Sequence, residues 1–166
     1  VYVLVVLSAF AQLAGWIWLV SILKLKWSLI KNNILPTAKI ILALSALALT
    51  AKLLLQLGST IPSLSNLAFG FRPIVIGYLH LVLLGVISLF LLGYMFAEKY
   101  FKTDKYSKCS VLIFAGGVIL NEILLMAQGV AAISYNTLPF INEMLLGTAL
   151  ILFSGALLLT FTKRNR

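Results

Sequence analysis

Long apolar runs separated by short polar segments dominate the hydrophobic pattern of this chain. A helix that crosses a membrane needs about 20 predominantly apolar residues. Five segments approach or exceed this length: Val1–Leu23, Ile40–Leu57, Ile74–Phe96, Ser110–Ile133 and Met144–Phe161. The runs are continuous and lack the alternation with a period of two that marks a β-barrel. The pattern therefore predicts an all-α integral membrane protein, a bundle of five transmembrane helices in one domain spanning residues 1–166.

The longest predicted loop, Gly58–Pro73, joins the second and third spans and carries Pro62, Gly70 and Pro73. Proline has no backbone N–H and a fixed φ, so Pro73 suits the first turn of the helix that follows. A short helix lying at the membrane interface is an option for the rest of this loop.

The composition agrees with a membrane protein. Hydrophobic residues make up 62% of the chain and charged residues 10%, against about 25% charged residues in soluble proteins. The net charge of +9 does not indicate nucleic-acid binding, because the lysines lie in short loops between apolar runs. The expected partners are the lipid bilayer and other transmembrane segments or subunits. The one cysteine, Cys109, excludes an internal disulfide and a cysteine metal cluster.

The basic residues predict the orientation of the spans. Eleven of the 13 lysines and arginines flank the same side of the predicted membrane, whereas Arg72 lies on the other side and Lys52 inside the second span. The eleven are Lys24, Lys26, Lys31, Lys39, Lys99, Lys102, Lys105, Lys108, Lys163, Arg164 and Arg166. By the positive-inside rule the C-terminus is cytoplasmic and Val1 is outside. We expect a multi-pass protein of the bacterial inner membrane, and an outside start with five crossings favours a segment of a longer polytopic chain.

Several polar residues lie within the predicted spans. At about 1.5 Å per residue, His80 lies about 9 Å from the outer end of its helix, and Lys52 and Gln128 about 8 Å from theirs. These three residues are predicted to share one outer layer. Gln12 and Glu122 lie about 16 Å in, near the midplane.

His80 is the only histidine and is ionisable within a membrane span, which makes it a candidate functional residue. It has three interpretations: a structural hydrogen-bond donor, a proton-relay group, or an axial ligand to heme iron. Without a second histidine or a nearby cysteine, it cannot form a zinc or copper site by itself.

The other intramembrane polar residues have interpretations of their own. Lys52 either extends its side chain toward the interface or neutralises an anionic group such as a heme propionate. An acid such as Glu122 costs about 2.5–3.5 kcal/mol at the centre of a span, so it is protonated, paired or part of a proton path. Asn121 and Gln128 are seven residues apart and share a helix face, where they can form hydrogen bonds between helices.

The run from Tyr78 through His80 to Gly85 resembles the tenth helix of the catalytic subunit of heme-copper oxidases. The following run, with Asn121, Glu122 and Gln128, looks like the eleventh helix of that subunit. The chain is also similar to short, divergent oxidase-like membrane proteins of Bacteroidetes. The resemblance implies that the five spans are the eighth to twelfth of a twelve-helix subunit.

The resemblance also implies a function: heme binding in membrane electron transfer, by an oxidase-like oxidoreductase of a respiratory chain. His80 would be an axial heme-iron ligand, Lys52 and Arg72 would neutralise the heme propionates, and Asn121, Glu122 and Gln128 would line a polar or proton path. The alternative is a non-redox transporter or membrane-complex assembly subunit, in which His80 only packs between helices.

The sequence departs from the oxidase pattern at two places. The family carries a His-x-His pair whose members point about 200° apart and serve two hemes, and Tyr78 stands at the first position here. The paired arginines that the family places after the eleventh helix are absent from Ser134–Asn142. The resemblance therefore assigns His80 to the low-spin heme position alone.

Overall fold

Helices make up almost all of the structure, a computed structural model that describes residues 2–30, 32, 34–102 and 104–162. The side chains of Ile30 and Leu67 are outside this description. The elements are α1 (Tyr2–Leu25), α2 (Trp27–Ile30), α3 (Pro36–Gly58), α4 (Pro62–Gly70), α5 (Arg72–His80), the π-helix η1 (Leu81–Ser88), α6 (Leu89–Ala97), α7 (Lys105–Ile133) and α8 (Ile141–Phe161).

The prediction of five long apolar helices is confirmed. Among the described residues five helices are long and apolar enough to cross a membrane: α1, α3, α7, α8 and the continuous Arg72–Ala97 helix formed by α5, η1 and α6. Each begins or ends a few residues beyond its apolar run. In α7 the side chain of Asp104 accepts a 2.9 Å hydrogen bond from the Ser107 backbone N–H. This cap lets the helix begin at Lys105, five residues before the apolar run.

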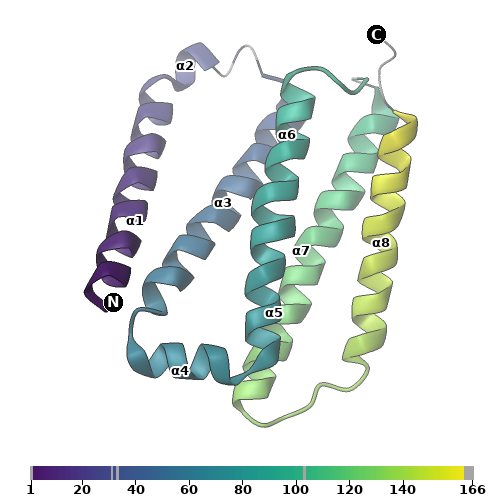
Figure 1. Cartoon of the computed structure of the whole chain (residues 1–166). Helices are drawn as coiled ribbons and strands as arrows, with labels where there is room; N and C mark the ends of the chain where they lie inside the picture. Colours follow the sequence, from purple (N-terminus) through teal and green to yellow (C-terminus); the bar gives the residue numbers. More distant parts are fainter. Residues whose placement is uncertain (1, 31, 33, 103, 163–166) are drawn as a thin grey trace.

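The five long helices form a row rather than a closed bundle (Figure 1). α3 packs on α1 at one side and on η1 and α6 at the other, α5 packs on α7, and α7 packs on α8. Large hydrophobic side chains therefore remain exposed on many helix faces, such as Trp18, Phe90, Met126 and Phe153. In a bilayer such faces contact lipid or other transmembrane helices.

The five long helices have their ends on two opposite sides of the structure, and these two sides differ in charge. Lys24, Lys26, Lys39 and the lysines between α6 and α7 lie at one end, which we call the basic end. Lys31, Lys163, Arg164 and Arg166 of the predicted basic side fall outside the described residues, as does Val1. α4 crosses the opposite end, the α4 end (Figure 1). The loop Gly58–Pro73, for which a short helix was one option, contains α4, and Pro73 lies in the first turn of α5 as predicted.

The buried core lies in the half of the row near the basic end, where α3, α6 and α7 meet. Its side chains include Ile41, Leu89, Phe96, Val111 and Val118. The ring of Phe96 also stacks on Phe101 with a centroid distance of 4.8 Å. The half near the α4 end, which holds His80, contains fewer buried side chains. The candidate residues His80, Lys52, Glu122 and Gln128 therefore lie in the more loosely packed half.

Candidate functional site

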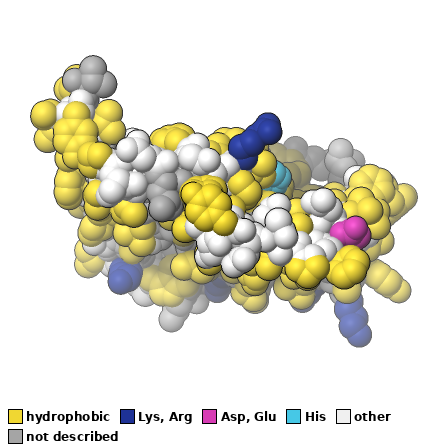
Figure 2. Space-filling model, turned by 90° about the horizontal axis from the view of Figure 1, so that it is seen from below, with side chains coloured by type: hydrophobic (Ala, Val, Ile, Leu, Met, Phe, Trp, Pro, Cys, Tyr) yellow, Lys and Arg dark blue, Asp and Glu magenta, His cyan; other side chains and the backbone are white. Residues whose placement is uncertain are grey.

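His80 is the last residue of α5 and is half-buried. Its Nδ1 lies 2.9 Å from the backbone carbonyl oxygen of Ile76, one turn earlier in the same helix. A carbonyl oxygen only accepts hydrogen bonds, so Nδ1 must carry the hydrogen in this contact. The lone pair of a neutral imidazole then lies on Nε2, for which the described part of the chain supplies no hydrogen-bond partner. Seen from the α4 end, the imidazole is partly visible at the surface (Figure 2).

A π-helix, η1, begins directly after His80. Two backbone carbonyls of η1 accept hydrogen bonds from serine side chains. Ser88 Oγ donates to the Leu83 carbonyl, and Ser45 Oγ on α3 donates to the Val86 carbonyl at 2.9 Å. Ser45 is buried. π-Helical segments within α-helices are frequent at functional sites. η1 was not predicted from the sequence, because no local pattern of residues indicates a π-helix there.

Contacts at two glycines show how α5 and α7 align. A Cβ added at Gly77 would lie 3.6 Å from Leu125 Cβ, and one added at Gly129 would lie 3.4 Å from Ile74. The helices run antiparallel, so the next turn places His80 opposite Glu122. The two side chains lie within electrostatic range of each other, and among the described residues neither an ion pair nor a hydrogen bond joins them. The register thus places at one level two ionisable residues that were predicted to lie in different layers.

Glu122 is half-buried and receives a 3.5 Å hydrogen bond from Nδ2 of its buried neighbour Asn121. The Asn121 amide therefore occupies Oε1 of Glu122 from within α7, whereas His80 approaches from the neighbouring helix α5. Asn121 and Gln128 were expected to link helices. Within the described residues, the hydrogen bond of Asn121 stays inside α7, and none is found for Gln128.

The predicted polar layers need correction. Since Gly129 faces Ile74, Gln128 lies near the α4 end, about 9 Å along α7 from Glu122. Glu122 is level with His80 instead. The prediction measured the depth of each residue from the end of its own helix, which assumes that all helices end at the same level. The contact of Gly129 with Ile74 shows that α7 extends beyond the start of the α5 apolar run.

Lys52 lies on α3 and reaches toward the α4 end. Its Nζ donates to Oε1 of Gln56, one turn closer to that end, and to Oε1 of Gln12 on α1 at 3.5 Å. Gly85 packs against Ala48, so one further turn brings the Lys52 backbone level with Leu81, next to His80. The side chain then carries its charge away from the midplane, as expected of a lysine that reaches toward the interface.

Arg72 is exposed at the first turn of α5, two turns before His80. Within the described residues neither Arg72 nor Lys52 forms a hydrogen bond with His80. Tyr78 is half-buried two residues before His80. The structure thus places Glu122 opposite His80 and leaves the charged groups of Lys52 and Arg72 nearer the α4 end.

The donor set limits what a metal could use here. The described residues contain no group of three or more histidine, cysteine, aspartate or glutamate side chains placed to hold a metal ion. Heme needs less from the protein, because its iron can be held by a single histidine. His80, with Nε2 available, fits that requirement.

Comparison of the chain with protein-family models, with curated proteins and with solved structures finds no match. The case for a function therefore depends on the geometry of this site.

Proposed function

We propose that the protein binds heme in the membrane and takes part in electron transfer, as an oxidase-like subunit in which His80 is an axial ligand through Nε2. The observation that carries this proposal is the 2.9 Å contact of His80 Nδ1 with the Ile76 carbonyl. A backbone carbonyl on one ring nitrogen fixes the tautomer and directs the other nitrogen to a metal. The bound heme would supply one-electron redox chemistry.

The positions of two cationic residues support a location for the heme propionates near the α4 end. The Lys52 ammonium reaches toward the α4 end, and Arg72 lies at that end of α5. We propose that they neutralise the propionates, while Glu122 and Asn121, with Gln128 further along α7, line a polar or proton path. The lysine-rich basic end would be cytoplasmic by the positive-inside rule, and the membrane would be the bacterial inner membrane.

The open row of helices supports a larger subunit. Helices in a row leave two broad apolar faces without protein contacts inside the described structure. We propose that further spans of a twelve-helix subunit cover part of these faces and supply the opposite side of the heme site. A second axial ligand, if the iron is six-coordinate, would come from such a span.

The test is a reduced-minus-oxidised absorption spectrum of the purified protein beside its His80→Ala variant. The parent should show a Soret band and an α-band. The variant should lose them or become high-spin, and added imidazole should restore the parental spectrum by occupying the vacated position. Glu122→Gln serves as the control, because it removes the carboxyl group level with His80 and leaves the ligand. A parent without heme absorption after heme supplementation would overturn the proposal.

The position of Glu122 opposite His80 on the packed helices α5 and α7 favours a second candidate, a non-redox transporter or assembly subunit in which His80 joins α5 to α7. In that case His80→Ala and Glu122→Gln should destabilise the protein similarly, and neither should change a visible spectrum.

A further inference from the structure

A lysine and two glutamines form a polar cluster where α1 meets α3, near the α4 end. α3 crosses the row obliquely, so that it lies beside α6 at the basic end and beside α1 at the α4 end (Figure 1). There Lys52 Nζ donates to Oε1 of Gln56 on its own helix and to Oε1 of Gln12 on α1. One turn closer to the basic end, Trp16 Nε1 donates to Thr50 Oγ1 and joins the same two helices. We call Lys52, Gln12 and Gln56 the lysine cluster.

The charge of Lys52 has no acidic partner in the described part of the chain. The sequence holds four acidic residues, and none of them lies on α1, α3 or α4. The hydrogen bonds of the ammonium go to carboxamide oxygens, which are neutral. Lys52 is half-buried within a span, where a charge without a counter-charge is costly. An anion bound at the lysine cluster would remove this cost.

The groups of the lysine cluster that are still available are hydrogen-bond donors. An ammonium has three hydrogens, and two of those on Lys52 are directed at the glutamine oxygens. Each carboxamide also carries an NH2 group on the carbon that bears this oxygen. Among the described residues, no acceptor takes up the third ammonium hydrogen or the NH2 groups of Gln12 and Gln56. Because N–H groups next to a positive charge form strong hydrogen bonds with phosphate and carboxylate oxygens, the cluster suits an oxyanion.

The lysine cluster lies near the level of lipid head groups. Gln56 is about 3 Å along the helix from Gly58, the last residue of α3, and the Lys52 ammonium reaches toward it. The ends of membrane-spanning helices lie near the polar head groups that border the hydrocarbon. Leu55 and Leu47, about two turns apart on one side of α3, are both more than half exposed. A ligand at this place meets donors at head-group level and apolar surface directly beside them.

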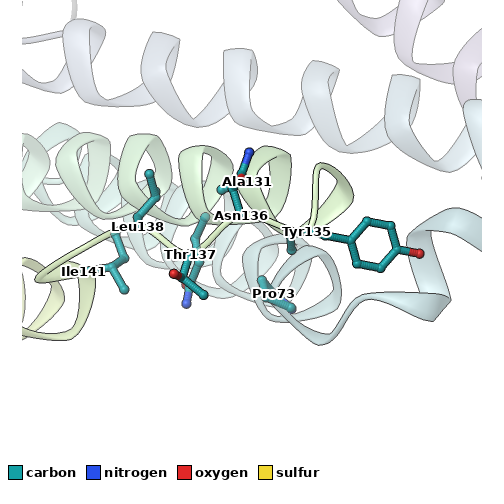
Figure 3. Close-up of a pocket in the computed structure, with 9 residues that line it drawn as sticks. Pro73, Ala131, Tyr135, Asn136, Thr137, Leu138 and Ile141 are labelled. Atoms are coloured by element: carbon teal, nitrogen blue, oxygen red, sulfur yellow. The ribbon is translucent and has the colours of Figure 1, made fainter.

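A hollow at the α4 end, between α5, α7 and the loop to α8, lacks such a charge. It has a volume of about 340 Å³, and its lining includes Pro73, Gln128, Asn136 and Thr137 (Figure 3). No lysine or arginine belongs to the lining that the structure describes. An anion bound in this hollow would have no counter-charge. The lysine cluster is therefore the better site for an oxyanion at this end of the molecule.

We propose that the lysine cluster binds the phosphate of one anionic phospholipid in the leaflet at the α4 end, with an acyl chain along the exposed leucines of α3. The net negative charge of a lipid such as phosphatidylglycerol neutralises Lys52, whereas phosphatidylcholine brings its own cation and leaves the lysine charge in place. The proposal goes beyond heme binding, because the lipid occupies the cluster in heme-free protein. A heme propionate has the same oxyanion chemistry and would replace this phosphate when heme binds.

The test is native mass spectrometry of the purified protein, prepared without heme and titrated with phosphatidylglycerol or phosphatidylcholine. The protein should bind the first phosphatidylglycerol at least about tenfold more tightly than phosphatidylcholine. Lys52→Gln should remove this preference, and Lys52→Arg, which keeps the charge, should retain it. The double variant Gln12→Leu/Gln56→Leu should weaken phosphatidylglycerol binding at least about fivefold, because the phosphate loses two donors. Circular dichroism checks that each variant is folded.

Matched controls separate the lysine cluster from general charge effects. Arg72→Gln removes one positive charge from the same end, Gln128→Leu changes a glutamine in the neutral hollow, and both should keep the preference for phosphatidylglycerol. His80→Ala should also keep it, which separates this test from that of the heme. Equal affinities for the two lipids, or an unchanged preference in Lys52→Gln, would overturn the proposal. Displacement of the lipid by excess inorganic phosphate would assign the cluster to a free anion and overturn the phospholipid.

Discussion

The α7–α8 contact and the α1–α3 contact join neighbouring helices of one row by different means. Gly155 lets α8 approach the backbone of α7, because an added Cβ would lie only 2.7 Å from the Phe114 nitrogen. On α1, Gly15 has no such neighbour within 4 Å, and the helix is joined to α3 by hydrogen bonds such as that from Trp16 Nε1 to Thr50 Oγ1 at 3.0 Å. Small residues fix one helix pair by shape, whereas polar side chains hold the other at a distance.

The largest expected effect comes from filling the closest approach. Gly155→Ala should separate α7 from α8 or bend one of them, at a cost of about 1–3 kcal/mol, because the new methyl group meets backbone that cannot rotate away. Thermal unfolding in detergent, followed by circular dichroism, measures the loss. Gly147→Ala on the same helix meets nothing within 4 Å and should leave stability unchanged. Equal unfolding curves for the two variants would refute the shape argument.

An intermediate effect is expected at the α3–η1 contact, which combines both means. Gly85 lies close to Ala48, and the buried Ser45 hydroxyl bonds to the Val86 carbonyl. Ser45→Ala should cost about 0.6–1.7 kcal/mol, the range found for hydrogen bonds between membrane helices. Faster amide exchange within η1 should accompany the loss. The control is Ser154→Ala, whose exposed hydroxyl bonds within its own helix; a loss as large there would show that the interhelical bond contributes nothing.

The smallest effect is expected at α1. Trp16→Phe removes the donor to Thr50, whose hydroxyl keeps its own bond to the Ala46 carbonyl, so the loss should be about 0.6 kcal/mol. Spin labels on α1 and α3, in a Cys109→Ser background, should show a broader distance distribution. Trp18→Phe is the matched control because Trp18 is 71% exposed. An unchanged distribution in Trp16→Phe would mean that other contacts position α1.

The spans were predictable because the bilayer imposes a simple rule on them. A helix in hydrocarbon must be long and apolar, so apolar runs alone locate all five long helices, and Pro62 and Pro73 mark the starts of α4 and α5. The positions of the ends were less predictable, since the Asp104 cap carries α7 past its apolar run.

The site was predictable in its residues and not in its geometry. His80 and Glu122 stand out in the sequence because ionisable groups are costly in a membrane. Their position at one level follows from the register of α5 and α7, which is seen in the contacts of Gly77 with Leu125 and of Gly129 with Ile74 and exists only once the helices are packed. The hollow between α5, α7 and the loop to α8 was not predicted, because its polar residues Asn136 and Thr137 resemble ordinary loop residues in the sequence.

The π-helix η1 also determines the azimuth of His80. A π-turn contains more residues than the 3.6 of an α-turn, so eight residues of η1 wind through a smaller angle than eight α-helical residues would. The direction in which the His80 side chain leaves the helix, relative to the faces of α6, therefore depends on the number of residues per turn in η1. Deleting one residue of η1 would shift the phase of the helix and point the same histidine at a different neighbour, with no change in any side chain around it.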